Sequence, residues 1–311
     1  MRRRRTVSAG FVALCATVAL FSGPSATSAA PSTTVAASSS RAPSGLLKGR
    51  TLVIAHRGDS STAPENTLPA MRAAASAGAD MVEFDVQRTS DGHLIVVHDT
   101  TFARTTDIAQ VYPALQNDPV GSFTLAQVRR LDAGQWFAPR YAGTKIPTLN
   151  ALLHAMAPTR TGLLLELKNP SLYPGYEAQI AHALDSSGFT SSQRVWVHSF
   201  DPTSLERFHD REPTVPVGLI TETGTAPSSD QPWITSVNTT TAQVTDKRVD
   251  AAASADVRVL AWPAQSDQDT SAEAERLVDD GVSGIITDYP SMVRRVVGQH
   301  TPAVASAHVS A

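Results

Sequence analysis

TLVIAHRG at residues 51–58 and MVEFDVQ at residues 81–87 are two aliphatic stretches of strand length, separated by the alanine-rich segment Leu68–Ala77. β-Branched residues favour strands, whereas alanine favours a helix and a glycine, here Gly78, often ends one. The same alternation continues to residue 287. Strands and helices that alternate over about 250 residues predict an α/β fold with a parallel sheet, the (β/α)8 TIM barrel.

The expected elements are short runs of similar length. The further strands are His93–Val97, Leu163–Leu167, Arg194–Val197, Val217–Ile220, Val257–Ala261 and Gly284–Thr287. The further helices are Thr124–Leu131, Leu149–Ala157, Tyr176–Ser186, Asp246–Ala255 and Ala272–Asp280.

The strand count alone does not establish closure into a barrel. Asp91-Gly92 between two strand-like runs predicts a hairpin turn, so one strand pair is expected to be antiparallel. Ile234–Asn238 is a further possible strand. A doubly wound open sheet is the alternative, but no G-x-G-x-x-G motif follows the first strand.

The two ends of the chain are expected to lie outside the catalytic domain. Residues 1–29 have arginines at 2–5, an apolar run at 9–21 that is too short to cross a bilayer, and small residues before a cleavage site after Ala29. We therefore expect a signal peptide and a secreted protein, exported by the Sec or the Tat route. Residues 30–45 predict a flexible leader, 46–298 the catalytic domain and 299–311 a disordered tail.

The amino-acid composition limits the kinds of molecule that the protein is expected to bind. The chain has 311 residues, 41% of them hydrophobic, which excludes a disordered protein. Its only cysteine, Cys15, lies in the expected signal peptide, and Leu14 before it does not suit a lipoprotein anchor. Removal of the four arginines leaves 22 basic and 29 acidic residues, a net charge of −7. We expect no nucleic-acid partner and no stable membrane anchor, and the sequence implies no protein partner.

Polar residues interrupt the strands where the barrel mouth is expected. His56 and Arg57 follow the first strand, and His98 follows the third. Pairs spaced by two residues lie on one face of a strand, which applies to Glu83 with Asp85 and to Glu166 with Lys168. The carboxyl ends of barrel strands form the mouth where chemistry takes place, so these side chains are expected to meet there.

The residue types suit phosphoryl chemistry. Neighbouring buried carboxylates repel unless a cation lies between them, and oxygen ligands without thiols suit Ca²⁺ or Mg²⁺. The alternative is that these carboxylates form structural ion pairs with Arg57 and Lys168. Two histidines, His56 and His98, can serve as a general acid and a general base. His198 and Trp262 end other strands and are candidates for substrate contact, with core packing as the alternative for Trp262.

The chain resembles the glycerophosphodiester phosphodiesterases, which are phosphodiesterase-type (β/α)8 barrels with a small insertion after the first strands. The similarity runs in order through residues 50–297. The motifs that carry it are His56-Arg57-Gly58, Pro64-Glu65-Asn66-Thr67, Glu83-Phe84-Asp85-Val86, Asp91-Gly92, Val97-His98-Asp99, Arg104-Thr105-Thr106, Ile146-Pro147-Thr148-Leu149, Leu165-Glu166-Leu167-Lys168, Ser199-Phe200-Asp201 and Thr287-Asp288-Tyr289-Pro290.

The resemblance implies roles for individual residues. His56 and His98 correspond to the catalytic pair, and Arg57 and Lys168 to phosphate ligands. Glu65 and Asn66 correspond to supporting residues, and the carboxylates correspond to ligands of one divalent cation, Ca²⁺ or Mg²⁺. Those metal ligands are Glu83, Asp85 and Glu166.

Two positions depart from the family pattern. Trp262-Pro263-Ala264-Gln265 stands where the family often has Trp-Thr-Val-Asn, and His198 stands where it often has Gln or Ser. Both positions are expected near the alcohol group of the substrate rather than near the metal. The segment Pro170–Tyr176 is also expected to shape the entrance.

The resemblance implies hydrolysis of glycerophosphodiesters to sn-glycerol 3-phosphate and a free alcohol. One alternative on the same scaffold is a lysophospholipase D type activity on lysophospholipids or lysoplasmalogens. Sphingomyelinase D-like enzymes share the barrel but match the His56-Arg57-Gly58 motif less well. A non-catalytic phosphate- or lipid-binding barrel is the alternative from a different class. The expected partner is therefore a small-molecule or lysolipid phosphodiester.

Overall fold

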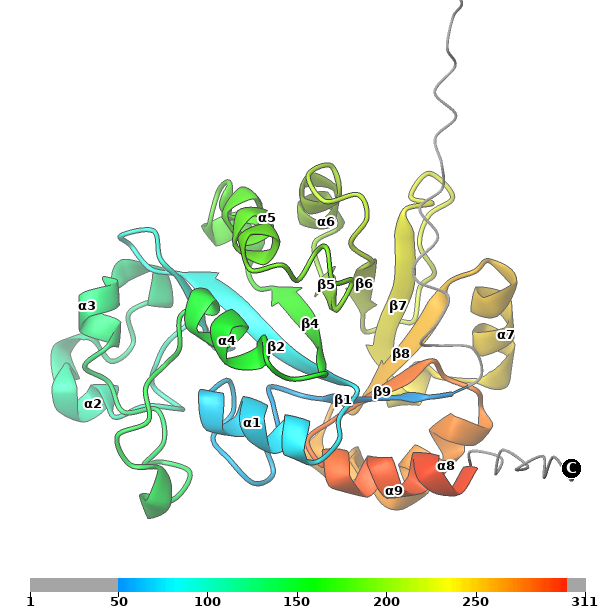
Figure 1. Ribbon diagram of the computed structural model, residues 1–311, viewed down its shortest axis with the longest axis horizontal. Coiled ribbons are helices and arrows are strands. Elements are labelled where there is room, and N and C mark those ends of the chain that lie inside the picture. Colours follow the sequence, from blue (N-terminus) through cyan, green and yellow to red (C-terminus); the bar gives the residue numbers. More distant parts are fainter. Residues whose placement is uncertain (1–49, 301–311) are drawn as a thin grey trace, which may run out of the picture. The chain divides into compact units, whose positions relative to one another are not determined.

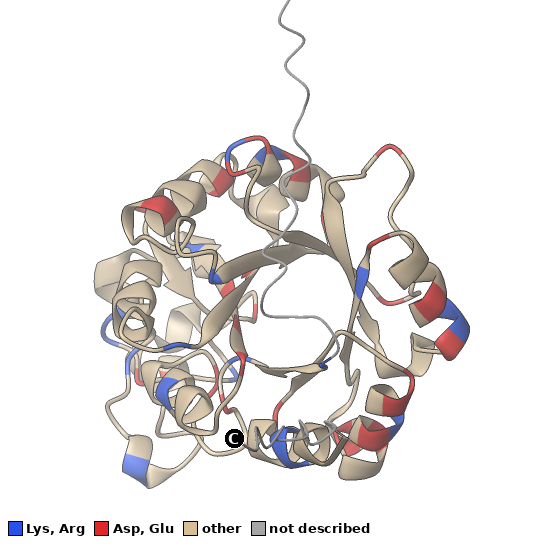
Figure 2. Ribbon diagram, turned by 45° about the vertical axis from the view of Figure 1, so that its right-hand side comes forward, with Lys and Arg blue, Asp and Glu red and all other residues tan. Residues whose placement is uncertain are grey.

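The computed structural model describes residues 50–300 of the chain. The expected signal peptide and leader lie outside these residues, as does the tail beyond residue 300. Eight parallel strands close into a barrel, with helices around it (Figures 1 and 2). The predicted TIM barrel is thereby confirmed. The strands are β1 (Leu52–Ala55), β2 (Met81–Arg88), β3 (Leu94–Val96), β4 (Gly162–Leu167), β5 (Val195–Ser199), β6 (Val217–Thr221), β7 (Ile234–Thr240), β8 (Arg258–Trp262) and β9 (Gly284–Thr287).

Barrel closure depends on the pairing of the first and last strands. The sheet order is β1-β9-β8-β7-β6-β5-β4-β2, and β1 also pairs with β2, which completes the ring. The possible strand at Ile234–Asn238 is real and is the barrel strand β7. The third expected strand, β3, pairs with β2, antiparallel, as the Asp91-Gly92 turn predicts, and with no other strand of residues 50–300. It therefore stands outside the ring and carries the following chain back toward the mouth.

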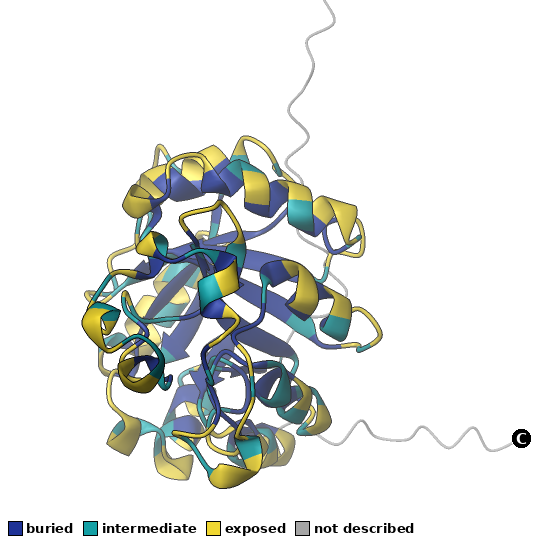
Figure 3. Ribbon diagram, turned by 90° about the vertical axis from the view of Figure 1, so that its left-hand side faces the viewer, coloured by how far each residue is buried: buried dark blue, intermediate teal, exposed yellow. Residues whose placement is uncertain are grey.

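Helices cover the outside of the barrel and expose their outer faces (Figure 3). Three helices were not expected, namely α2 (Ile108–Val111), α6 (Pro202–His209) and α9 (Pro290–His300). Helix α6 begins at Pro202 behind Asp201, whose carboxylate accepts hydrogen bonds from the next turn. None of the helices in residues 50–300 could span a membrane. The helices are α1 (Leu68–Ser76), α2 (Ile108–Val111), α3 (Leu125–Val128), α4 (Leu149–Met156), α5 (Tyr176–Ser186), α6 (Pro202–His209), α7 (Asp246–Ser254), α8 (Ser271–Asp279) and α9 (Pro290–His300).

Two regions differ in extent from the expectation. Helix α9 runs through Gln299 and His300, which the sequence pattern placed in the tail. The insertion lies between β3 and α4 and holds α2, α3 and three 3-10 turns. It has an apolar core of its own, with Phe102 and Phe123 in edge-to-face contact at 5.3 Å. The 3-10 turns within residues 50–300 are η1 (Pro113–Leu115), η2 (Val120–Ser122), η3 (Pro139–Tyr141), η4 (Pro170–Leu172), η5 (Thr241–Gln243) and η6 (Ser266–Gln268).

The two-residue period of the strands separates the barrel interior into layers. Met81, Leu164 and Trp196 belong to an apolar cluster inside the barrel. Residues two positions later on the same strands face the same way but lie nearer the carboxyl ends. Those residues are Glu83 on β2, Glu166 on β4 and His198 on β5. They form a polar layer directly above the apolar cluster, which we call the apolar floor.

Candidate active site

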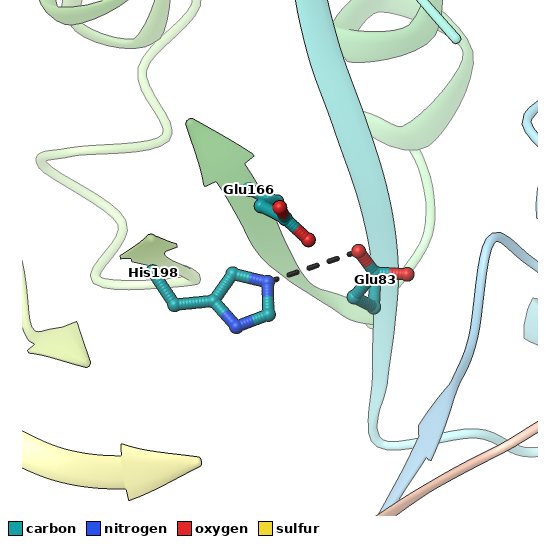
Figure 4. Close-up of side chains that lie close together, drawn as sticks. All are labelled: Glu83, Glu166 and His198. Atoms are coloured by element: carbon teal, nitrogen blue, oxygen red, sulfur yellow. Dashed lines mark ion pairs between the residues drawn. The ribbon is translucent and has the colours of Figure 1, made fainter. Parts of the chain in front are cut away.

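The polar layer of the interior brings together two carboxylates and an imidazole. Glu83 on β2, Glu166 on β4 and His198 on β5 are 2, 7 and 3% exposed (Figure 4). Each offers a ligand atom within 4.8 Å of those of the other two. Two oxygen ligands of one calcium ion, each at about 2.3–2.6 Å, can lie as far apart as about 5 Å, so this spacing suits a shared cation.

His198 points at the buried carboxylates of the neighbouring strands. It was expected near the alcohol group of the substrate, but its Nε2 lies 3.7 Å from Glu83 Oε1. The reason is the register of the sheet, in which His198 pairs with Glu166 across β4 and β5. Partners in neighbouring strands face the same side, so the imidazole points at the carboxylates.

Asp85, two residues beyond Glu83, is almost completely buried and surrounded by donors. The Asn66 amide donates to Asp85 Oδ2 at 2.8 Å, and Lys168 Nζ and Arg57 Nε lie 3.5 and 3.6 Å from the carboxylate. Burial would raise the pKa of Asp85, but Lys168 and Arg57 outweigh it and hold this pKa well below its usual range. Asp85 is therefore ionised, and its Oδ1 has no hydrogen-bond partner.

Glu166 experiences the opposite effect. Burial and the charge of Asp85 raise the pKa of Glu166, although Lys168 donates a hydrogen bond to it at 2.9 Å. Asp85 and Glu166 thus share the positive charge of Lys168, which does not offset the burial of both carboxylates. A divalent cation among these oxygens would supply the missing charge and engage Asp85 Oδ1, which accepts no hydrogen bond, so the residues present fit a Ca²⁺ or Mg²⁺ ion.

Both expected catalytic histidines are hydrogen-bonded to carboxylates. His56 Nδ1 lies 2.7 Å from Asp288 Oδ1, and His98 Nδ1 lies 2.7 Å from Asp99 Oδ1. A carboxylate at Nδ1 favours the tautomer with its hydrogen there and leaves Nε2 to exchange a proton with a ligand. Both imidazoles are about a third exposed, so they can be reached from the mouth.

Asp99 and Asp288 were not among the residues singled out from the sequence. Each lies within a family motif, but a motif does not say which carboxylate pairs with which histidine. Asp288 is held in turn by Ser60, which donates to its carboxylate at 2.8 Å, and by Asp269, which accepts from its backbone N–H at 2.7 Å.

The pKa of His56 reflects its neighbours. Burial and the charge of Arg57 lower this pKa, but the hydrogen bond that His56 donates to Asp288 and the charge of Glu83 raise it by more, so the net shift is upward. His56 therefore remains protonated to higher pH than a free imidazole. That state suits a general acid.

The loop after β1 presents its groups to the site through backbone that ordinary residues rarely adopt. Arg57 and Asn66 have positive φ angles of 54° and 57°. In this conformation the Arg57 N–H donates to Glu83 Oε2 at 2.9 Å, while its guanidinium donates to Glu65 at 2.8 Å. Its Nε is buried without a hydrogen-bond partner. Positive φ at a non-glycine residue is costly and recurs at functional sites.

Glu65 joins this loop to the one that carries His98. Its carboxylate accepts two hydrogen bonds from Arg104 at 2.6 and 2.7 Å. Arg104 also donates to both oxygens of Asp99 at 2.7 and 2.9 Å. One guanidinium therefore links the support of Arg57 to the partner of His98. Arg104 belongs to a family motif, but its bridging position depends on the fold.

Trp262 lies at the end of β8 and packs against the apolar cluster inside the barrel. Its Nε1 is buried without a hydrogen-bond partner. Of the expected residues, Trp262 is thus the one that joins the apolar floor, whereas the metal, phosphate and catalytic candidates lie in or above the polar layer.

Comparison with known proteins agrees with this arrangement. Residues 56–292 match the Glycerophosphoryl diester phosphodiesterase family. The chain belongs to this family. A glycerophosphodiester phosphodiesterase of Caldanaerobacter subterraneus is 34% identical over 256 residues, which cover 80% of this chain and 98% of the relative. One of Bacillus subtilis is 30% identical over 269 residues, covering 81% and 88%.

Solved structures of phosphodiesterases have the same fold. An Oleispira antarctica phosphodiesterase in complex with the product sn-glycerol-3-phosphate matches with a TM-score of 0.67 and 26% identity, over 80% of this chain and 97% of that one. A glycerophosphodiester phosphodiesterase from Agrobacterium tumefaciens matches with a TM-score of 0.66 and 26% identity, covering 79% and 99%. This chain is accordingly an enzyme of the glycerophosphodiester phosphodiesterase family.

Proposed function

We propose that the enzyme carries out metal-dependent hydrolysis of glycerophosphodiesters to sn-glycerol 3-phosphate and a free alcohol. The observation that carries this proposal is the pairing of two histidines with carboxylates beside a cluster of buried acidic groups. The backbone N–H of Arg57, next to His56, donates to Glu83 Oε2 at 2.9 Å, and the backbone N–H of Val97, next to His98, donates to the backbone oxygen of Asp85 at 3.0 Å. Both histidines therefore border the same cluster.

Glu83, Asp85 and Glu166 would hold the divalent ion, Ca²⁺ or Mg²⁺. When bound, the ion would stabilise negative charge that builds on the phosphate. Arg57 and Lys168, which already neighbour Asp85, would bind the phosphate oxygens. Glu65 and Asn66 would hold Arg57 and Asp85 in place through the hydrogen bonds described above.

In the proposed mechanism, His98 takes the proton of the glycerol hydroxyl next to the phosphate, and that oxygen forms a bond to phosphorus. The bond from phosphorus to the alcohol oxygen breaks, and His56 gives its proton to this oxygen. In the second step His56 takes a proton from water, whose oxygen attacks the cyclic phosphate. The ring bond from phosphorus to the oxygen that attacked in the first step then breaks, and His98 returns its proton to that glycerol oxygen. The histidines thereby regain their first states.

Replacement of either catalytic histidine tests these roles. We expect His56→Ala and His98→Ala each to lower kcat by about 10²–10⁴-fold, the usual contribution of acid–base catalysis. His154 on α4 is exposed and serves as a matched control, since His154→Ala should keep full activity. Normal turnover by either active-site variant contradicts the assignment. Solvent ¹⁸O in the product without any trappable cyclic species would count against the cyclic route.

The main alternative is lysophospholipase D type activity. One observation favours it, because Phe200 at the mouth is 48% exposed, with its ring 5.9 Å from Lys168 Nζ. An apolar ring beside a phosphate ligand could contact an acyl chain. A substrate panel of glycerophosphocholine, glycerophosphoethanolamine and lysophospholipids, with Ca²⁺ and Mg²⁺ added separately, decides between the two. We expect higher kcat/KM on the glycerophosphodiesters.

We also propose that the enzyme is secreted, with cleavage after Ala29. The support is the arginine-rich start, the short apolar run and the small residues that follow it. N-terminal sequencing of protein collected from culture medium tests this, with Ala30 expected as the first residue. Retention of residues 1–29 in that protein contradicts it.

A further inference from the structure

We propose that His198 Nε2 is a ligand of the divalent ion, and that this nitrogen makes the site favour first-row transition ions such as Mn²⁺ and Co²⁺ over Ca²⁺. The inference rests on the metal dependence proposed above and adds to it a ligand and a metal preference. Imidazole suits transition ions, whereas sites made only of oxygen suit Ca²⁺ and Mg²⁺.

The position of His198 is the first observation. It is 3% exposed, and its Nε2 has no hydrogen-bond partner. The nearest carboxylate oxygen, Glu83 Oε1, lies 3.7 Å away, which is too far for a hydrogen bond and fits two ligands of one ion (Figure 4). A buried polar atom without a partner is costly, and a metal between His198, Glu83 and Glu166 would remove that cost.

The second observation is the support behind the imidazole. Asn238 on β7 is fully buried, and its Nδ2 lies 2.9 Å from His198 Nδ1. Its Oδ1 has no partner. The Asn238 amide can hydrogen-bond to either tautomer of His198. In the present orientation Nδ2 donates to an unprotonated Nδ1, and a 180° rotation about χ2 of Asn238 would let Oδ1 accept from an Nδ1–H. That tautomer leaves the Nε2 lone pair free for a metal, and a second hydrogen-bonding group of this kind is usual behind a ligating histidine.

The barrel makes room for this support. Gly218 on β6 lies between the strands of His198 and Asn238. A Cβ at Gly218 would lie 2.3 Å from Ser236 Oγ and 3.0 Å from Asn238 Nδ2. A side chain there would therefore displace the amide from its place behind His198.

The proposal adds His198 to the carboxylate ligands named above and does not depend on whether Asp85 is one of them. Asp85 does not belong to the cluster of Glu83, Glu166 and His198 within the described part of the chain, and it already faces Asn66 and two cations. Whether or not Asp85 is a ligand, His198 adds to the site an imidazole nitrogen that can bind a metal ion. Neither Gln nor Ser at this position would supply such a nitrogen.

The test uses Mn²⁺ bound to the full enzyme and measures coordination rather than turnover. Pulsed EPR of the Mn²⁺-loaded wild type should show ¹⁴N coupling from a directly bound imidazole. His198→Gln should lose this coupling and bind Mn²⁺ and Co²⁺ about 10–100-fold more weakly by calorimetry, while its Ca²⁺ affinity changes little. His56→Gln, which removes a nearby imidazole outside the cluster, should retain the coupling.

Absence of ¹⁴N coupling in the wild type, or its persistence in His198→Gln, overturns the proposal. If His198→Gln fails to fold, Asn238→Ala gives a second measurement, with the ¹⁴N coupling kept and Mn²⁺ affinity reduced. An unchanged Mn²⁺ affinity in Asn238→Ala also counts against the inference. Failure of the proposed function is distinct, because it would appear as lack of phosphodiesterase turnover in a protein that still binds Mn²⁺ through nitrogen.

Discussion

His56 Nδ1 and Asp288 Oδ1 lie 2.7 Å apart, although 232 positions separate the two residues in the chain. The contact exists because His56 follows β1 and Asp288 follows β9, the first and last strands of the barrel, which pair with each other. Barrel closure thus completes the hydrogen-bonded pair of His56 and Asp288. A stable barrel and a correctly oriented His56 depend on the same strand pairing.

Asp288→Asn should shift the pH profile in a direction that identifies the role of His56. Asp288 raises the pKa of His56, together with Glu83, while burial and Arg57 lower it and Asp269 lies behind Asp288. Loss of the carboxylate should lower this pKa. A general acid must be protonated, so activity falls as pH rises through its pKa, and the alkaline limb of kcat should move to lower pH.

The same substitution should also lower kcat about 10–100-fold, because the imidazole loses the group that fixes its tautomer. Asp267, an exposed residue of η6, provides a matched control, and Asp267→Asn should keep the wild-type profile. Movement of the acidic limb instead would assign His56 as the base. A profile that does not move at all would mean that Asp288 does not act through His56.

Gln87 holds the loop that carries His98. Its side chain is fully buried, and Nε2 donates to the carbonyl oxygens of Val97, His98 and Asp99 at 2.9, 3.0 and 2.8 Å. The Tyr173 hydroxyl donates to Oε1 of the Gln87 side chain at 2.9 Å and thereby fixes the orientation of the side-chain amide. Gln87 follows β-strand alternation and gives no sequence signal for this role, which arises only because β3 folds back on β2.

Gln87→Leu should release the His98 loop. We expect kcat to fall about tenfold or more with KM nearly unchanged, because about 1 Å of misplacement of a catalytic group can cost up to about 100-fold. Unpaired carbonyls should also reduce the free energy of unfolding by about 1–3 kcal/mol. Tyr173→Phe removes only the hydroxyl that orients Gln87, so its loss of kcat should be smaller. Equal losses of kcat in the two variants, or a change confined to KM, argue against a positioning role.

Removal of the divalent ion should abolish activity and reduce stability. An ion that binds only the folded state adds about 2.7 kcal/mol to the free energy of unfolding at about 100 times its Kd. We therefore expect exhaustive EDTA treatment to lower both kcat and Tm, and added ion to restore them. Glu166→Gln should abolish the ion-dependent rise in Tm, whereas Glu275→Gln at an exposed position of α8 should preserve it. Full activity after EDTA treatment would remove the metal from the mechanism.

The sequence was sufficient to predict the barrel and to place the candidate site residues at the ends of its strands. Period-two spacing placed Glu83 with Asp85 and put polar groups at strand ends, and those inferences need only local geometry. The partners of the histidines could not be obtained in this way. Asp288 reaches His56 only through barrel closure, and the identity of that contact is not contained in either local segment.

His198 illustrates the same limit from the other side. Its position at a strand end was clear, but whether it faces substrate or metal depends on which residue stands opposite it on the next strand. The register between β4 and β5 sets Glu166 opposite His198. A shift by one residue would turn the imidazole out of the barrel, and the sequence alone does not define that register.

Gly58 sets how closely the loop after β1 packs against helix α1, and its replacement provides a stability prediction. Its φ is 88°, and a Cβ there would lie 2.6 Å from Ala70 Cβ and 2.7 Å from the Ala70 carbonyl carbon. Gly58→Ala should therefore cost both backbone strain and a steric clash, about 2–5 kcal/mol in total. Gly92 has a similar φ of 85° but nothing within 4 Å, so Gly92→Ala should cost only the strain, about 1–2 kcal/mol. Urea unfolding measures both changes, and kcat should fall in Gly58→Ala alone because His56 and Arg57 move with the loop. Equal loss of stability in the two variants would show that the contact with Ala70 does not constrain the loop.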